Sequence, residues 1–350
     1  MNGFYHLGEL DRTEVEALVA RALELRAGAT PHRFPGRTLG LLFLNPSLRT
    51  RASFQVAAAR LGLVPVVLSS GGSQGVWELE LEDGVVMDGT TVEHVREAAG
   101  VLGRYVDCLG VRAFPGMRDL DHDRRDPALA GFRTFSGVPV INMESALWHP
   151  CQALGDRVTL EALGVEPHAK LVLTWAWHPK ALPHAVPNST LTMAAQRGME
   201  VVVLRPAGYD LHPAVMAEAE QLAQAAGGSV RVSEERSDLA GARIVYAKSW
   251  ASLETYGDAE AESRLRAGLR SWCVDERQMA AAGKTARFMH CLPVRRNVVV
   301  SDAVLDGPTS VVLDQAENRL YAQTAVLERV YAELGPPPSR AEMALQETLR

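Results

Sequence analysis

The sequence has few cysteines and no long apolar run. Its 350 residues include four cysteines, none of them in a C-x-x-C pair or at the spacing of metal ligands: Cys108, Cys151, Cys273 and Cys291. No stretch reaches the length of a membrane span, and the first ten residues lack the basic and apolar regions of a secretion signal. We therefore expect a soluble cytoplasmic protein with reduced thiols and no bound metal.

The sequence also lacks an excess of positive charge. Its net charge of -6 provides no basic field for a polyanion, so we expect no nucleic-acid partner, and any anion that it binds should be small. A dinucleotide is disfavoured as well, because no G-x-G-x-x-G follows a predicted strand and no acidic ribose ligand stands at the expected distance. The glycine-rich stretch 70–76 does not have that spacing.

The pattern that is present is an alternation of short β-rich runs with amphipathic helical stretches. It predicts two parallel-sheet α/β domains linked by helices, with the active site in the cleft between them. We divide the chain into domains 1–148 and 149–322 and a C-terminal helix, 323–350, that packs back on the first domain. The expected strands are 38–44, 64–69, 106–112 and 138–143, then 170–175, 200–204, 229–232, 243–248 and 287–290, and the expected helices include 92–102, 151–164 and 317–334.

Polar clusters follow four of the predicted strands, at the edge where parallel sheets bind ligands. They are Ser47-Leu48-Arg49-Thr50-Arg51, Arg112, His149-Pro150-Cys151-Gln152 and His290-Cys291-Leu292-Pro293. At a helix N-terminus, Ser47, Thr50 and Arg49 can bind a phosphate group. The alternative is that Ser47 only caps the helix and that Arg49 and Arg51, in the first helical turn, are solvated.

Ser-x-Arg-Thr-Arg near residue 50, His-Pro-x-Gln near 150 and His-Cys-Leu-Pro near 290 resemble the aspartate/ornithine carbamoyltransferase family, over nearly the whole chain. The resemblance implies transfer of a carbamoyl group from carbamoyl phosphate to an amine, without a metal or an organic cofactor. It implies catalytic roles for Arg49, Arg112 and His149. The implied carbamoyl phosphate site is Ser47, Leu48, Arg49, Thr50, Trp77, Arg112, His149, Gln152, Cys291, Leu292 and Arg319, with Trp77 reaching a neighbouring active site in a homotrimer.

The second half of the chain resembles the branch of the family that acts on N-acylated ornithine in arginine biosynthesis. It lacks the Ser-Met-Gly loop of ornithine enzymes and has Tyr246-Ala247-Lys248-Ser249-Trp250 instead. An acylated nitrogen carries no charge and needs no acidic partner. The substrate residues that we expect are Glu144, Val92, Lys180, Pro183, Lys248 and Arg296.

Two positions favour N-succinylornithine as the acceptor. N-acetylornithine enzymes typically carry Glu in the helix start after Met-Asp-Gly, where this chain has Val92, and a Glu there would repel a succinyl carboxylate. Pro183 lies in a proline-rich stretch that resembles the succinyl enzymes, whereas acetyl enzymes usually carry Asn at the equivalent position. Val92 departs from both patterns, because succinyl enzymes carry Pro, so N-acetylornithine stays an alternative. A catalytically silent anion-binding relative is a second alternative, which the intact set of motifs disfavours.

Overall fold

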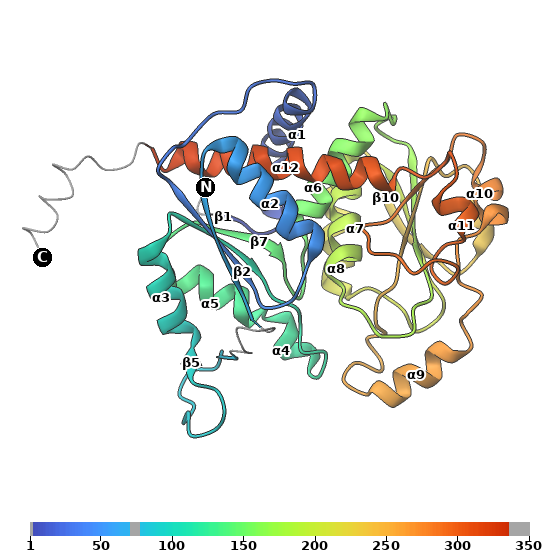
Figure 1. Ribbon diagram of the computed structural model, residues 1–350. Coiled ribbons are helices and arrows are strands. Elements are labelled where there is room, and N and C mark those ends of the chain that lie inside the picture. The colour runs from blue at the N-terminus through green and yellow to red at the C-terminus, as the bar shows by residue number, and fades with distance from the viewer. Residues whose placement is uncertain (1–2, 71–77, 336–350) are drawn as a thin grey trace, which may run out of the picture.

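Two five-stranded parallel sheets form the framework of the protein, and they lie side by side (Figure 1). The computed structural model describes residues 3–70 and 78–335. In spatial order the first sheet consists of β1 (Gly3–Phe4), β7 (Val140–Glu144), β6 (Cys108–Arg112), β2 (Thr38–Phe43) and β3 (Val64–Ser69). The second consists of β10 (Ser229–Ser233), β9 (Glu200–Leu204), β8 (Lys170–Trp175), β11 (Ile244–Lys248) and β12 (Arg287–Met289). This confirms the predicted fold class.

Helices cover both faces of each sheet, because alternate strand residues point to opposite sides. In β8, for example, Leu171 and Leu173 belong to one apolar core while Val172 belongs to another. On the first sheet α3 (Val95–Tyr105) and α5 (Pro127–Phe135) cover one face, and α1 (Arg12–Arg26), α2 (Leu48–Leu61) and α6 (Pro150–Ala162) lie on the other. On the second sheet α7 (Ala185–Arg197) and α8 (Pro213–Ala225) pack opposite α10 (Glu276–Ala282) and α11 (Asp302–Leu305). Two further helices are α4 (Leu120–Arg124) and α9 (Ala259–Ala267).

The long helix α12 (Val312–Glu333) runs along α1, α2 and α6 and joins the two halves of the protein (Figure 1). Near its C-terminal end the Tyr331 hydroxyl donates to the carbonyl oxygen of Thr38 at 2.7 Å, and near its start Asn318 donates to Thr159 at 3.0 Å. The helix passes residue 322 without a break. The division of the chain into domains at residues 148 and 322 stays a prediction.

Several element boundaries differ from the sequence-based expectation. Helix α3 begins at Val95 instead of residue 92, because the His94 side chain accepts from the backbone N–H of Arg96 and caps the helix there. Helix α12 begins five residues earlier than expected, at Val312, without a side-chain cap that the sequence could have signalled. Strands β1, β4 (Leu79–Glu80) and β5 (Glu93–His94) were not predicted, because two residues are too few for a pattern.

Candidate active site

A cavity of about 690 Å³ lies where the carboxyl ends of β2, β6 and β7 face those of β11 and β12. Side chains from both sheets line it. The residues that the sequence predicted and that the structure brings together here are Ser47, Leu48, Arg49, Thr50, Arg112, Glu144, His149, Gln152, Pro183, Lys248, Cys291, Leu292 and Arg319. All four strand-end clusters therefore contribute to one hollow.

The start of α2 forms one wall of the cavity and is built to bind an anion. Ser47 is the N-cap, and its hydroxyl accepts from the backbone N–H of Thr50 at 3.3 Å. The Thr50 hydroxyl in turn accepts from the buried Arg319 guanidinium at 2.9 Å. The Nε atoms of Arg49 and Arg319 are buried and have no hydrogen-bond partner in the described part of the chain. Buried cationic donors beside a positive helix end favour the binding of an anion.

Arg112 and Glu144 end neighbouring strands and meet at the floor of the cavity. The Arg112 guanidinium forms a buried ion pair with Glu144, and His149 Nε2 lies 3.5 Å from the same carboxylate oxygen. Arg112 Nε and His149 Nδ1 are buried without a partner among the described residues. The backbone N–H of His149 donates to the Ser189 hydroxyl at 2.7 Å, which ties this wall to α7. The Glu144 carboxylate thus holds the Arg112 guanidinium and the His149 ring close together.

The His149 ring is an uncharged donor or acceptor at neutral pH. Burial, followed by the positive charges of Arg319, Arg112 and Lys248, holds the pKa of His149 well below its ordinary value. Cys291 is a thiol for a related reason, since burial raises its pKa. This agrees with the expectation that Cys291 is not a nucleophile.

The neutrality of His149 leads to a prediction. A lowered pKa means that the ring takes up a proton only at a lower pH than an ordinary histidine, so we expect His149 to stay neutral as the pH falls from 8 to 6. Nuclear magnetic resonance of histidine-labelled protein, with His149→Gln to assign the signal, measures this directly. A midpoint near the ordinary value of about 6.5 would contradict it.

The second domain contributes a cation that the sequence reasoning missed. Arg295 lines the cavity, and its Nε atom donates to His178 Nε2 at 3.0 Å. Its neighbour Arg296, which we had expected at the substrate, is exposed and pairs with Asp302 and Asp306. Adjacent residues of the turn after β12 point in different directions, and the sequence alone does not tell which arginine faces inward.

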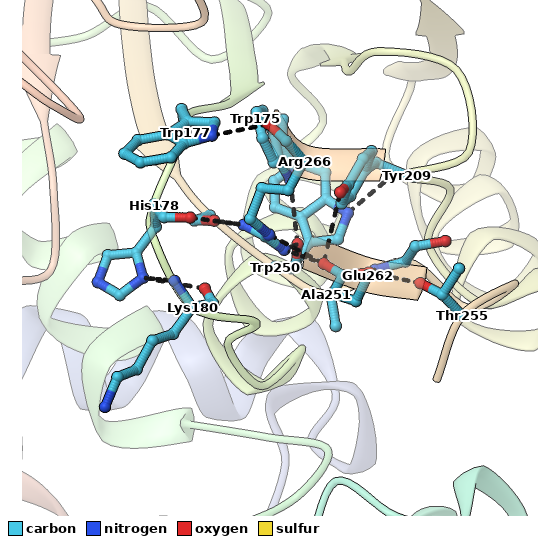
Figure 2. Close-up of polar contacts among 12 residues, drawn as sticks. Trp175, Trp177, His178, Lys180, Tyr209, Trp250, Ala251, Thr255, Glu262 and Arg266 are labelled. Atoms are coloured by element: carbon cyan, nitrogen blue, oxygen red, sulfur yellow. Dashed lines mark hydrogen bonds and ion pairs between the residues drawn. The ribbon is translucent and has the colours of Figure 1, made fainter. Parts of the chain in front are cut away.

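Two other expected acceptor residues do not line the cavity. Lys180 is exposed, and its backbone N–H donates to His178 Nδ1 at 3.1 Å (Figure 2). Val92 is 84 % exposed, because it precedes β5 and α3 in a connecting segment instead of packing in a helix. Trp77 lies outside the described residues. The described residues that we expected to bind carbamoyl phosphate all line the cavity, whereas only some of the residues expected to bind the acceptor do.

A buried ion pair supports the second-domain side of the cavity. Arg266 pairs with Glu262 in α9 and donates to the carbonyl oxygens of His178 and Trp250, at 3.2 and 3.1 Å (Figure 2). It also donates to the hydroxyl of Ser249, a cavity residue, at 3.0 Å. One guanidinium therefore fixes the segments after β8 and β11 that border the cavity.

The fold and the site define a class: α/β enzymes that bind an anion between two parallel-sheet domains. The family model described as the aspartate/ornithine carbamoyltransferase carbamoyl-P binding domain matches residues 3–162, and the model of the Asp/Orn binding domain matches residues 182–330. The chain belongs to the aspartate/ornithine carbamoyltransferase family and is a carbamoyltransferase.

Individual relatives lie in the N-acylornithine branch of this family. The chain is 43 % identical over 337 residues to the N-acetylornithine carbamoyltransferase of Xanthomonas axonopodis pv. citri, covering 95 % of this chain and 97 % of the relative. It is 39 % identical over 324 residues to the N-succinylornithine carbamoyltransferase of Bacteroides thetaiotaomicron, covering 91 % and 96 %.

A solved structure is similar in fold as well as in sequence. It is a glutamate-to-valine variant of N-acetyl-L-ornithine transcarbamylase, complexed with carbamyl phosphate and N-succinyl-L-norvaline. It matches with a TM-score of 0.89 and 43 % identity, covering 94 % of this chain and 99 % of that one.

Among the described residues of the present chain, no helix combines the length and apolar character that a membrane span requires.

Proposed function

We propose that this enzyme transfers the carbamoyl group of carbamoyl phosphate to the δ-amine of N-succinyl-L-ornithine, giving N-succinyl-L-citrulline and phosphate in arginine biosynthesis. The observation that carries the proposal is the set of buried donors without partners, on Arg49, Arg112, His149 and Arg319, that surround one cavity. Carbamoyl phosphate supplies the negative charge and the acceptor oxygens that these hydrogen-bond donors need.

The donor would lie with its phosphate at the start of α2. Backbone and side-chain donors are available there from residues 47–50. The Arg319 guanidinium donates to the Thr50 hydroxyl and adds a positive charge beside them. Arg112 would bridge the phosphate and the carbonyl oxygen, with neutral His149 donating to that oxygen. The carbamoyl NH2 group would donate to Gln152 and to the backbone carbonyls of Cys291 and Leu292.

Catalysis then rests on donors fixed where negative charge develops. The neutral δ-amine attacks the carbonyl carbon, a carbon–nitrogen bond forms, and charge collects on the oxygen that faces Arg112 and His149. The bond to phosphate breaks next, and the departing phosphate can take the proton of the amine, so no separate general base is required. Glu144, which ends β7 beside Arg112 and His149, would hold the δ-amine through its carboxylate.

The acceptor carboxylates need cations, and among the described residues Lys248 and Arg295 line the second-domain part of the cavity. The N-succinyl assignment is supported by Pro183, which lines the cavity, and by Val92. The solved relative in which a glutamate was replaced by valine was complexed with N-succinyl-L-norvaline, and we propose that Val92, after Met87-Asp88-Gly89, takes the place of that glutamate. Because Val92 is exposed in the single chain, it would act on the acyl group from a neighbouring subunit.

N-acetyl-L-ornithine is the second candidate, and one observation favours it. The N-acetylornithine relative is 43 % identical to this chain, against 39 % for the N-succinylornithine relative. Overall identity is shaped by the whole chain, whereas acceptor choice depends on a few residues around the acyl group.

A side-by-side assay tests the proposal. Initial rates of ureido product formation are measured with carbamoyl phosphate and, in turn, N-succinylornithine, N-acetylornithine, ornithine and aspartate. We expect the highest kcat/KM with N-succinylornithine. A preference for N-acetylornithine would select the second candidate, and turnover of free ornithine or aspartate alone would refute both.

We further propose a homotrimer in which Trp77 reaches the active site of a neighbouring subunit. If sites are shared, a mixed assembly of Trp77→Ala and Arg49→Ala chains contains some sites that combine an unchanged Arg49 from one subunit with an unchanged Trp77 from its neighbour. We therefore expect mixed, inactive single variants to regain part of the activity after dissociation and reassembly. Mixed oligomers that remain as inactive as the separate variants would exclude sharing.

A further inference from the structure

Asp156 is a fully buried carboxylate that contacts the cavity residue Gln152, one helical turn before it in α6. One of its oxygens, Oδ1, accepts from two amide groups, Nε2 of Gln152 and Nε2 of Gln315, each at 2.7 Å. Gln315 belongs to α12, so this carboxylate links two helices at the point where the cavity ends.

The pairing fixes which end of the Gln152 side chain faces the cavity. Burial raises the pKa of Asp156 to about 6, so at neutral pH the group is a carboxylate that only accepts hydrogen bonds. The NH2 end of Gln152 must therefore point down, since the reverse orientation would place two acceptors against each other. Its oxygen, Oε1, is buried, lacks a hydrogen-bond partner in the described part of the chain and belongs to a cavity residue.

We propose that Asp156 is a positioning residue that holds the Gln152 amide oxygen toward the carbamoyl nitrogen of the donor, an inference that rests on the proposed function. An amide oxygen accepts from an NH2 group, whereas an amide NH2 in its place would repel it. Asp156 touches neither substrate, and its effect passes through Gln152.

The same carboxylate orders the opposite side of the carbamoyl group. Gln315 donates its NH2 end to Asp156, and its oxygen accepts from the backbone N–H of His290 at 3.0 Å. His290 begins the turn with Cys291 and Leu292, and its Nδ1 atom accepts from the backbone N–H of Leu292 at 2.9 Å. Asp156 therefore fixes both walls between which a carbamoyl NH2 group would lie.

A buried carboxylate at this position has a desolvation cost, and the orientation of the Gln152 amide is what it provides in return. Besides the two glutamine amides, the Tyr246 hydroxyl interacts with this carboxylate, yet burial still raises the pKa of Asp156. A buried charge costs free energy of folding even where it accepts hydrogen bonds. A neutral side chain would avoid that cost but would not force the Gln152 amide into one orientation.

The test compares two ligands in full-length Asp156→Ala, with Asp156→Asn as an isosteric variant that preserves volume. Isothermal titration calorimetry gives Kd for carbamoyl phosphate and for inorganic phosphate, which lacks the carbamoyl group. We expect the Kd for carbamoyl phosphate to rise about tenfold in Asp156→Ala, the effect of losing roughly one hydrogen bond, and to rise less in Asp156→Asn. The Kd for inorganic phosphate should stay within about twofold of wild type.

Thr159→Val is the matched control, because Thr159 also forms a buried α6–α12 hydrogen bond, with Asn318, but does not line the cavity. We expect it to lower the melting temperature and to leave both Kd values unchanged. Wild-type carbamoyl phosphate binding in both Asp156 variants, or an equal loss for the two ligands, would overturn the proposal. The calorimetry needs no turnover, so a wild-type enzyme that transfers no carbamoyl group would refute the proposed function separately.

Discussion

Replacement of Arg112 by alanine is expected to lower kcat by about a hundred- to a thousandfold, the typical effect of removing a donor that stabilises a developing oxyanion. Arg112 lies at the floor of the cavity beside His149, and its unpaired buried Nε atom is available to a ligand. Its loss also leaves the Glu144 carboxylate without its buried partner. Steady-state kinetics with saturating carbamoyl phosphate and N-succinylornithine measure the effect.

Arg37 provides the control for this experiment. It too is a buried arginine of the first sheet paired with a carboxylate, Asp107 at 2.5 Å, but it precedes β2 at the opposite edge of the sheet from the cavity. Arg37→Ala should reduce the melting temperature and retain kcat near the wild-type value. Our assignment fails if Arg112→Ala retains kcat within about threefold, or if Arg37→Ala loses as much as Arg112→Ala while still folded.

The second large effect is expected from Val92→Glu, which should shift the acceptor preference from N-succinylornithine to N-acetylornithine. Two carboxylates 4 Å apart repel each other by about 4 kcal/mol at an effective dielectric constant of 20. Water around this exposed residue weakens the repulsion, so we expect the ratio of the two kcat/KM values to change by about tenfold or more. The measurement is kcat/KM for both acceptors in the wild type and in the variant.

Val86→Glu separates a local repulsion from a general charge effect. Val86 is likewise exposed, at 78 %, and lies in the same segment before α3. The same charge at Val86 should leave the acceptor ratio unchanged. An unchanged ratio in Val92→Glu, or an equal change in both variants, would remove the physical basis of the succinyl assignment.

The sequence predicted the architecture and the meeting of the strand-end clusters in one cavity, because both follow from local patterns. Apolar runs mark the buried strands, and a polar cluster after a parallel strand can only lie at one edge of its sheet. That geometry brings Arg49, Arg112 and His149 into one cavity although they are far apart in the sequence. The convergence needed no knowledge of side-chain packing.

The acceptor side and the support of the site were less predictable, because they depend on packing and on turn geometry. The choice between Arg295 and Arg296 depends on the path of a single turn, and the sequence-based choice of Arg296 was not reproduced. The contact between Asp156 and Gln315 spans 159 residues, so no local motif announces it. Short polar segments such as the one that holds Val92 have no periodic pattern from which to predict where they point.

The measurement that tests the account most directly is a crystal structure of the enzyme with carbamoyl phosphate and N-succinyl-L-norvaline, which lacks the reacting amine. We predict the phosphate at the start of α2 within reach of Arg49 and Arg112, and the carbamoyl nitrogen against the Gln152 oxygen. The succinylated compound should contact Lys248 and Arg295. Donor density elsewhere, or a phosphate in the cavity with Arg112 and His149 turned away from it, would contradict the account.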